Sequence, residues 1–165
     1  MCDLPPNVVS TRFNTDTLTQ NIAYRKTYNV RCIYCEQVPM PMHILFGNFV
    51  FVIEMNNSIN EIAGIGMVRN TPSDVSIKEM YGNASRVYMY KGILHLNRET
   101  ILALNPTLLS ILESMLFTKK THSKRGCGFT SLPSKLVKQL DFNVPASIKE
   151  LFVETYQIRE KREMP

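Results

Sequence analysis

The segment from Phe49 to Arg69 constrains the fold more than any other part of the sequence, because it has the pattern of two strands joined by a short turn. Residues 49–55 (FVFVIEM) and residues 61–69 (EIAGIGMVR) are both rich in β-forming side chains, and the polar residues between them predict a turn. We therefore expect an antiparallel hairpin. Gly64 and Gly66 lie two positions apart and share one face of the second strand, where glycine admits a neighbouring backbone, a bulge or a ligand.

The rest of the chain predicts further strands in its first half and helices in its second half. Alternation of apolar and polar residues indicates strands, and asparagine or Asn-Pro at a segment start indicates a helix. The predicted elements outside the hairpin are an irregular lead-in (1–12), a helix capped by Asn14 (14–28), a strand (31–38), a further strand or two (85–96), helices beginning at Asn97 and at Asn105-Pro106, and a C-terminal helix (145–165).

The order of these elements predicts the fold class. The middle strands follow one another without helices between them, whereas a parallel β-α-β fold would require such helices. We therefore predict a single domain over residues 1–165 of class α+β. Its sheet is expected to be curved and largely antiparallel, or to close into a small barrel, and to be flanked by helices.

Composition narrows the cellular setting. Four cysteines in 165 residues are too few for a disulfide scaffold, which favours a reducing, intracellular compartment. No apolar run approaches the roughly 18 residues that a membrane span needs, and the N-terminus has no signal-peptide pattern. We expect no membrane partner. The formal net charge of +5 is weak support for an acidic partner.

The basic residues are concentrated in one segment. Residues 118–140 contain no Asp or Glu, and within them "TKKTHSKRGCGFTSLP" (118–133) is punctuated by two glycines. The segment lacks the G-x4-G-K-[ST] pattern of a nucleoside triphosphate loop, so scattered basic groups suit a phosphate polymer better. The alternative is a solvated surface loop. The residues predicted to contact phosphate, with backbone approach at the glycines, are Lys119, Lys120, His122, Lys124, Arg125, Gly126 and Gly128.

Aromatic residues on the predicted strands offer a stacking surface for unpaired bases. Tyr88 and Tyr90 share one strand face and are followed by Lys91, which adds a charge beside the rings. The alternative is that this face packs into the core. Both interpretations remain open from the sequence.

Two other kinds of site are formally available. Cys32, Cys35, His122 and Cys127 would complete a zinc site, although Cys32 and Cys35 point to opposite faces of a strand and 86 residues separate Cys35 from His122. The alternative is buried cysteines without metal. Cys127 with His122 could instead serve as nucleophile and base, but no orienting acid lies near them in the sequence. His122 is the best candidate for a catalytic acid or base.

Several motifs resemble known families. The segments "GNFVFVIEM" (47–55) and "EIAGIGMVRN" (61–70) resemble the central hairpin of the PUA-like superfamily, which includes the EVE, ASCH and YTH domains. The segments "RVYMYKGILHLNRE" (86–99) and "LFTKKTHSKRGCGFTSLP" (116–133) resemble small uncharacterised proteins of large nucleocytoplasmic DNA viruses, the giant viruses.

The first resemblance implies a small β-barrel that binds RNA or a modified base. YTH domains hold methylated adenine in a tryptophan-rich cage, and because this chain has no tryptophan, Tyr34, Tyr88 or Tyr90 would have to substitute. The second resemblance implies a host cytoplasm, viral factory or virion location, with other virion proteins as partners.

The leading hypothesis is therefore a nucleic-acid-binding protein, with RNA or another single strand as its partner. One alternative is a viral structural or assembly protein that binds other proteins. A third is an enzyme that acts on nucleic acid. No cofactor is expected apart from the candidate zinc.

Overall fold

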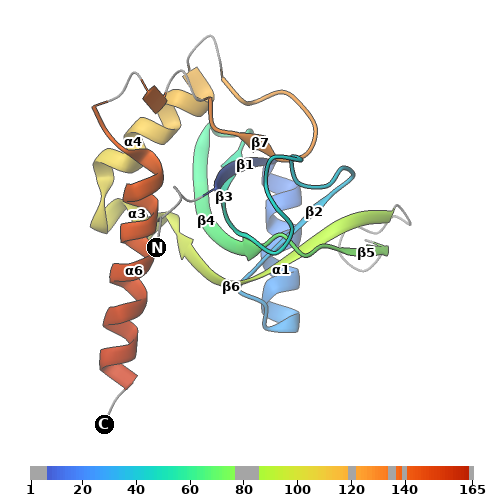
Figure 1. The fold of residues 1–165 in the computed structure, drawn as a ribbon, viewed down its shortest axis with the longest axis horizontal. Helices are drawn as coiled ribbons and strands as arrows, with labels where there is room; N and C mark the ends of the chain where they lie inside the picture. Colours follow the sequence, from blue (N-terminus) through green and yellow to red (C-terminus); the bar gives the residue numbers. More distant parts are fainter. Residues whose placement is uncertain (1–6, 77–85, 119–121, 134–136, 139–140, 164–165) are drawn as a thin grey trace.

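The computed structural model describes residues 7–76, 86–118, 122–133, 137–138 and 141–163. Over these residues the chain is α+β, with a curled sheet and helices on both sides of it (Figure 1). The strands are β1 (Asn7–Phe13), β2 (Cys32–Glu36), β3 (Phe49–Asn56), β4 (Glu61–Arg69), β5 (Ser73–Ser76), β6 (Arg86–Asn97) and β7 (Thr130–Ser131). The helices are α1 (Thr15–Tyr28), α3 (Arg98–Leu104), α4 (Pro106–Glu113) and α6 (Val144–Glu163), and α4 continues into a π-helical turn, η1 (Ser114–Thr118).

The sheet confirms the predicted fold class. In the described part of the chain its strand order is β2-β6-β4-β3-β1-β7, with β5 also paired to β6. The pairing of β1 with β3 is parallel, and the other pairings are antiparallel. The sheet is therefore largely antiparallel, and its curvature brings β1 close to β2, where the Thr11 hydroxyl donates a hydrogen bond to the Glu36 carboxylate.

The prediction of an irregular lead-in over 1–12 is wrong for residues 7–12, which belong to β1; residues 1–6 lie outside the described part. Val8 pairs with Phe51 and Val9 with Val52, so both faces of β1 are buried. The hydrogen-bond partners of β1 are supplied by a strand more than 40 residues away. A local pattern of residues therefore does not reveal this strand.

The predicted hairpin is confirmed as β3 and β4. Val52 pairs with Gly66 and Ile53 with Ile65, and the register shifts between Glu54 and Met55. β6 is one continuous strand. Gly92 pairs with both Cys32 and Val68, so β2 and β4 must lie on opposite edges of β6.

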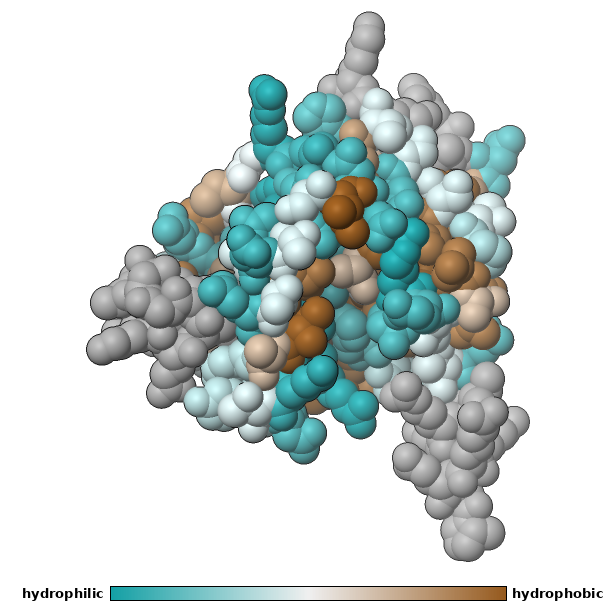
Figure 2. All heavy atoms as spheres, turned by 180° about the vertical axis from the view of Figure 1, so that it is seen from behind, coloured by the Kyte–Doolittle hydropathy of each residue, from teal (hydrophilic) through white to brown (hydrophobic). Residues whose placement is uncertain are grey.

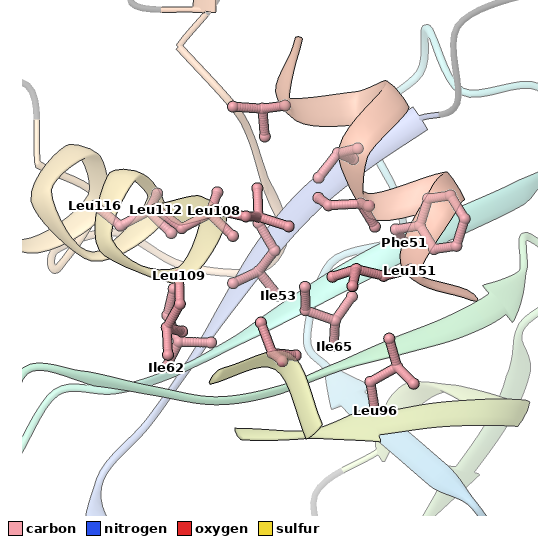
Figure 3. Packing of buried hydrophobic residues seen from close by; sticks show 14 of the residues in the cluster. Phe51, Ile53, Ile62, Ile65, Leu96, Leu108, Leu109, Leu112, Leu116 and Leu151 are labelled. Atoms are coloured by element: carbon pink, nitrogen blue, oxygen red, sulfur yellow. The ribbon is translucent and has the colours of Figure 1, made fainter. Parts of the chain in front are cut away.

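One face of the sheet packs against α3, α4, η1 and α6. In Figure 3, leucines of α4 and Leu151 of α6 point toward Ile53, Ile62, Ile65 and Leu96 of the sheet. We call this group the helix-side cluster, and its members include Val8, Phe51, Ile53, Met55, Ile62, Ile65, Leu96, Ile101, Leu108, Leu109, Leu112, Leu116, Ile148, Leu151 and Phe152. No described helix is by itself long and apolar enough to cross a membrane; α3 and α4–η1 pass only as a pair bent by 120°.

The inside of the curled sheet holds a second core, the barrel cluster. Its members include Val9, Phe13, Cys32, Tyr34, Met40, Ile44, Val50, Val52, Val68, Tyr90 and Phe129. Successive residues of β3 alternate between the two clusters, as the two-residue period of a strand requires. This is why β3 is almost continuously apolar, with Glu54 as the charged exception on the inner face.

Helix α1 lies along the open side of the curled sheet, where it contacts β1 and β2. Asn14 caps its first turn as predicted, because its side chain accepts from the Thr17 N–H. The inward-facing residues of α1 are partly polar: Leu18 packs on the barrel cluster, whereas Asn21 and Arg25 are buried. The buried guanidinium of Arg25 therefore requires a negatively charged partner inside the sheet.

Candidate functional site

The basic loop runs from His122 to Thr130 in the described part of the chain and is held by Arg12 of β1. The Arg12 guanidinium donates to the Ser123 carbonyl (3.1 Å), to the Thr130 hydroxyl (2.9 Å) and to the Gly128 carbonyl. The loop is therefore tied near both of its ends to a strand of the core sheet. Its basic side chains project from a fixed backbone.

The predicted phosphate contacts differ in their exposure. His122 and Arg125 are exposed and Lys124 is half-buried. Gly126 and Gly128 have φ values of +125° and +74°, a backbone region that favours glycine. Lys119 and Lys120 lie outside the described residues.

A second loop lies directly against the basic loop. The residues between β2 and β3 pass beside it (Figure 1), where Val38 packs on Gly128 and His43 Nε2 lies 3.3 Å from the Ser131 hydroxyl. This connection, which we call the apolar loop (residues 38–48), exposes Met42 by 98% and Phe46 by 80%. No sequence motif predicted a role for this loop, although the run Met-His-Ile-Leu-Phe (42–46) outside any predicted strand was an available signal.

The proposed stacking pair is corrected by the structure. Tyr90 is only 1% exposed, its ring packs edge-on against Phe129, and its hydroxyl accepts a hydrogen bond from the Met40 N–H. Its ring therefore has no free face for a base, as in the core-packing alternative. Tyr88 is 37% exposed and Lys91 is exposed, so these two stay available at the surface.

The four candidate zinc ligands do not converge. Among the described residues, no group of three or more His, Cys, Asp or Glu side chains is arranged to hold a metal ion. Cys32 is buried in the barrel cluster, whereas Cys127 is exposed. Burial, with nearby Glu54 and Glu36 respectively, raises the pKa of Cys32 and of Cys35 to about 12, so neither is poised as a thiolate.

The face that carries Gly64 and Gly66 is filled by protein. A Cβ at Gly66 would overlap the Tyr34 hydroxyl, and a Cβ at Gly64 would lie 2.7 Å from His95 Nε2. The glycines thus make room for two side chains inside the curled sheet.

These side chains surround a buried carboxylate. Glu54 is 1% exposed, and its Oε1 lies 2.7 Å from the Arg25 Nη2, 2.7 Å from the Tyr34 hydroxyl and 3.0 Å from His95 Nε2. Burial alone would raise the pKa of this carboxyl. His95, Arg25 and Tyr34 together outweigh that effect and lower the pKa to about 2. Glu54 is therefore ionised, and it is the partner that Arg25 needs.

A pocket of about 420 Å³ opens beside this network. It lies at the C-terminal end of α1, next to the end of β6 and the start of α3. The lining residues are Arg25, Lys26, Asn29, Val30, Arg31, His95, Asn97 and Thr100. The lining contains three permanent cations and no acid. No sequence motif indicated the pocket, because its residues come from two segments, 25–31 and 95–100, that lie far apart in the chain.

Comparison with known proteins gives one structural similarity. No family model and no curated protein matches the sequence. Among solved structures, the chain is similar to the YTH domain of the Zygosaccharomyces rouxii MRB1 protein, which was solved in complex with N6-methyladenosine RNA. The two share 8% sequence identity over 92% of this chain and 91% of that chain, with a TM-score of 0.39. At this low TM-score the description of the fold rests on the strand pairing itself, and the PUA-like resemblance stays a prediction.

Proposed function

We propose that the protein binds single-stranded nucleic acid, RNA in the first instance, across the basic loop and the apolar loop. The observation that carries the proposal is the direct packing of an acid-free, cation-bearing loop on a loop that exposes Phe46. Single strands are bound by this combination, because cations contact the phosphates while bases stack on aromatic rings. Selection of a modified base stays a prediction.

Each part of this surface has a defined role in the proposal. Lys124, Arg125 and His122 contact phosphates, and Gly126 lets the backbone come close to them. Phe46 provides the stacking face that Tyr90 lacks. Arg12 keeps the loop backbone in place, so less order has to be gained on binding.

The test is a titration of labelled RNA oligonucleotides followed by fluorescence anisotropy at several salt concentrations. Lys124→Ala with Arg125→Ala should lower the affinity and flatten its dependence on salt, because fewer counterions are released. Phe46→Ala should lower the affinity by roughly 1–3 kcal/mol without changing the salt dependence. Lys149→Ala on α6, at the helix-covered face, is a single-charge control and should bind as the unmodified chain does.

Unchanged affinity in the Lys124→Ala/Arg125→Ala variant would overturn the proposed role of the basic loop. A comparable loss per charge removed in the Lys149→Ala control would point to the overall charge instead.

A second candidate function is binding of another protein, as in the viral assembly alternative. Met42, Leu45 and Phe46 form an exposed apolar group of a kind that often marks protein contacts. Association through these residues would survive high salt and would not require nucleic acid. The third hypothesis, an enzyme with His122 as acid or base, stays a prediction.

A further inference from the structure

The pocket beside Arg25 is separate from the surface proposed above. The basic loop hydrogen-bonds to the Asn57 side chain near the start of α1, whereas the pocket is lined by residues at the end of that helix. The 14 residues of α1 span about 21 Å. The face that carries α1 is mostly hydrophilic when the molecule is seen from behind (Figure 2).

The residues that line the pocket carry a net positive charge. Among the described residues, neither Lys26 nor Arg31 forms an ion pair, and both are exposed. Glu54 offsets the charge of Arg25, but it is buried behind Arg25 and does not line the pocket. Two full positive charges therefore remain for a ligand.

Arg25 is also fixed in position as a hydrogen-bond donor. Its Nε donates to the Asn21 side-chain oxygen (2.6 Å), and Asn21 in turn donates to the Ile33 carbonyl (2.9 Å). Its Nη2 donates to Glu54. A guanidinium has five N–H groups in a rigid fork. The bonds to Asn21 and Glu54 use two of them.

The two N–H groups on Nη1 of Arg25 are among those left for a ligand. Nη1 lies 3.3 Å from His95 Nε2. That nitrogen also lies 3.0 Å from the ionised Glu54, which requires it to be a donor rather than an acceptor. Nη1 therefore keeps its hydrogens for an acceptor in the pocket. The side chain of Asn97 has a spare N–H2 as well, since only its oxygen is used to cap Thr100.

We propose that this pocket binds the phosphate of a phosphomonoester, with Arg25, Lys26 and Arg31 around it. A phosphomonoester carries about −1.5 to −2 charges at neutral pH, which matches the two unbalanced cations. A planar guanidinium fork fits phosphate oxygens. The volume of about 420 Å³ is in the range of small-molecule sites, so part of the group that bears the phosphate also enters. A free nucleotide and the phosphorylated 5′ end of a strand share this chemistry.

The experiment is isothermal titration calorimetry of the full chain with AMP, adenosine, and a short RNA with either a 5′-phosphate or a 5′-hydroxyl. AMP should bind and adenosine should not. Lys26→Ala with Arg31→Ala should weaken AMP binding by about tenfold or more. Both residues are exposed, so this variant should fold, whereas removal of Arg25 would leave Glu54 buried without its partner. Lys149→Ala is the control, and its affinity for AMP should equal that of the unmodified chain.

Two results would identify the source of the phosphate and two would overturn the proposal. Tighter binding of the 5′-phosphorylated RNA than of the 5′-hydroxyl RNA supports a strand end, and equal binding of the two RNAs supports a free nucleotide. Equal binding of AMP and adenosine, or unchanged AMP affinity in the Lys26→Ala/Arg31→Ala variant, would overturn it. The Lys124→Ala/Arg125→Ala variant should keep its AMP affinity, so this proposal and the proposed function fail independently.

Discussion

At the scale of single residues, Glu54 decides how the inside of the sheet is arranged. It stands on the inner face of β3 among apolar neighbours, and a buried ion is costly unless it is paired and hydrogen-bonded. Arg25, Tyr34 and His95 meet that requirement from three different elements. Replacing such a network by apolar groups is often neutral for stability, so stability alone does not explain the network, which suits a role in positioning Arg25 at the pocket.

The first prediction concerns acid. The pKa of Glu54 is lowered from 4.5 to about 2 in the folded protein, so its contribution to stability is present above pH 4.5 and is lost as the pH falls toward 2. The free energy of unfolding should drop by about 3 kcal/mol over this range, as measured by denaturant titration at a series of pH values.

Two variants separate Glu54 from the other carboxyl groups. Glu54→Gln should be less stable at neutral pH and should lose this part of the acid dependence. The pKa of Glu36 is raised by burial, so Glu36→Gln should leave the acid-side loss in place. An acid profile that is the same in Glu54→Gln and the unmodified chain would contradict the prediction.

A second prediction concerns Gly66. Gly66→Ala should destabilise the protein by roughly 1–3 kcal/mol, because the new methyl group overlaps Tyr34 and Cys32 in a packed interior. Thermal or denaturant unfolding measures the effect. Gly47→Ala is the comparison: nothing lies within 4 Å of its Cβ, so only its φ of +85° should cost stability. A smaller effect at Gly66 than at Gly47 would show that the interior adapts.

At the scale of elements, the basic loop depends on β1. Arg12 bonds to three positions of the loop, and the packing of Val38 on Gly128 joins the loop to the β2–β3 connection. A loop fixed in this way presents its cations at less conformational cost than a mobile loop would.

The third prediction follows from this anchoring. Arg12→Lys keeps the charge but loses the forked donors, so backbone hydrogen exchange over residues 123–130 should speed up while β3 and β4 stay protected. RNA affinity should fall as well. Arg69→Lys is the control for the exchange measurement, since Arg69 stacks on Phe49 and donates to the Gly47 carbonyl of the apolar loop rather than to the basic loop. Unchanged exchange in the loop of Arg12→Lys would exclude the proposed anchoring.

At the scale of the whole molecule, two cores share one sheet. The helix-side cluster and the barrel cluster lie on opposite faces of β3 and β4, so neither can come apart without exposing the other. This arrangement favours a single cooperative unit, as the prediction of one domain over residues 1–165 requires.

The fourth prediction tests that cooperativity. Leu112→Ala should lower the free energy of unfolding by roughly 2–5 kcal/mol through the loss of packing in the helix-side cluster. Circular dichroism of the helices and labelling of the buried Cys32 thiol should report the same transition, in a background with the other cysteines changed to serine. If the Cys32 thiol stayed protected from labelling after the circular dichroism signal of the helices was lost, the two clusters would not unfold as a single cooperative unit.

Local patterns in the sequence determined several elements correctly. The β3–β4 hairpin, the Asn14 cap of α1 and the start of α4 at Pro106 each depend on residues close together in the chain. The α+β class followed from the order of such elements.

Tertiary structure decided what lies next to what. β1 exists because β3 supplies its hydrogen bonds, and Tyr90 is buried because Phe129 and Met40 cover it. The cation-lined pocket joins α1, the end of β6 and the start of α3, and the apolar loop meets the basic loop across some 90 residues of sequence. The sequence by itself determined the basic segment and most of the elements, because these depend on residues close together in the chain. The burial of each ring and charge depends on contacts between residues far apart in the sequence, and only the tertiary structure decides those.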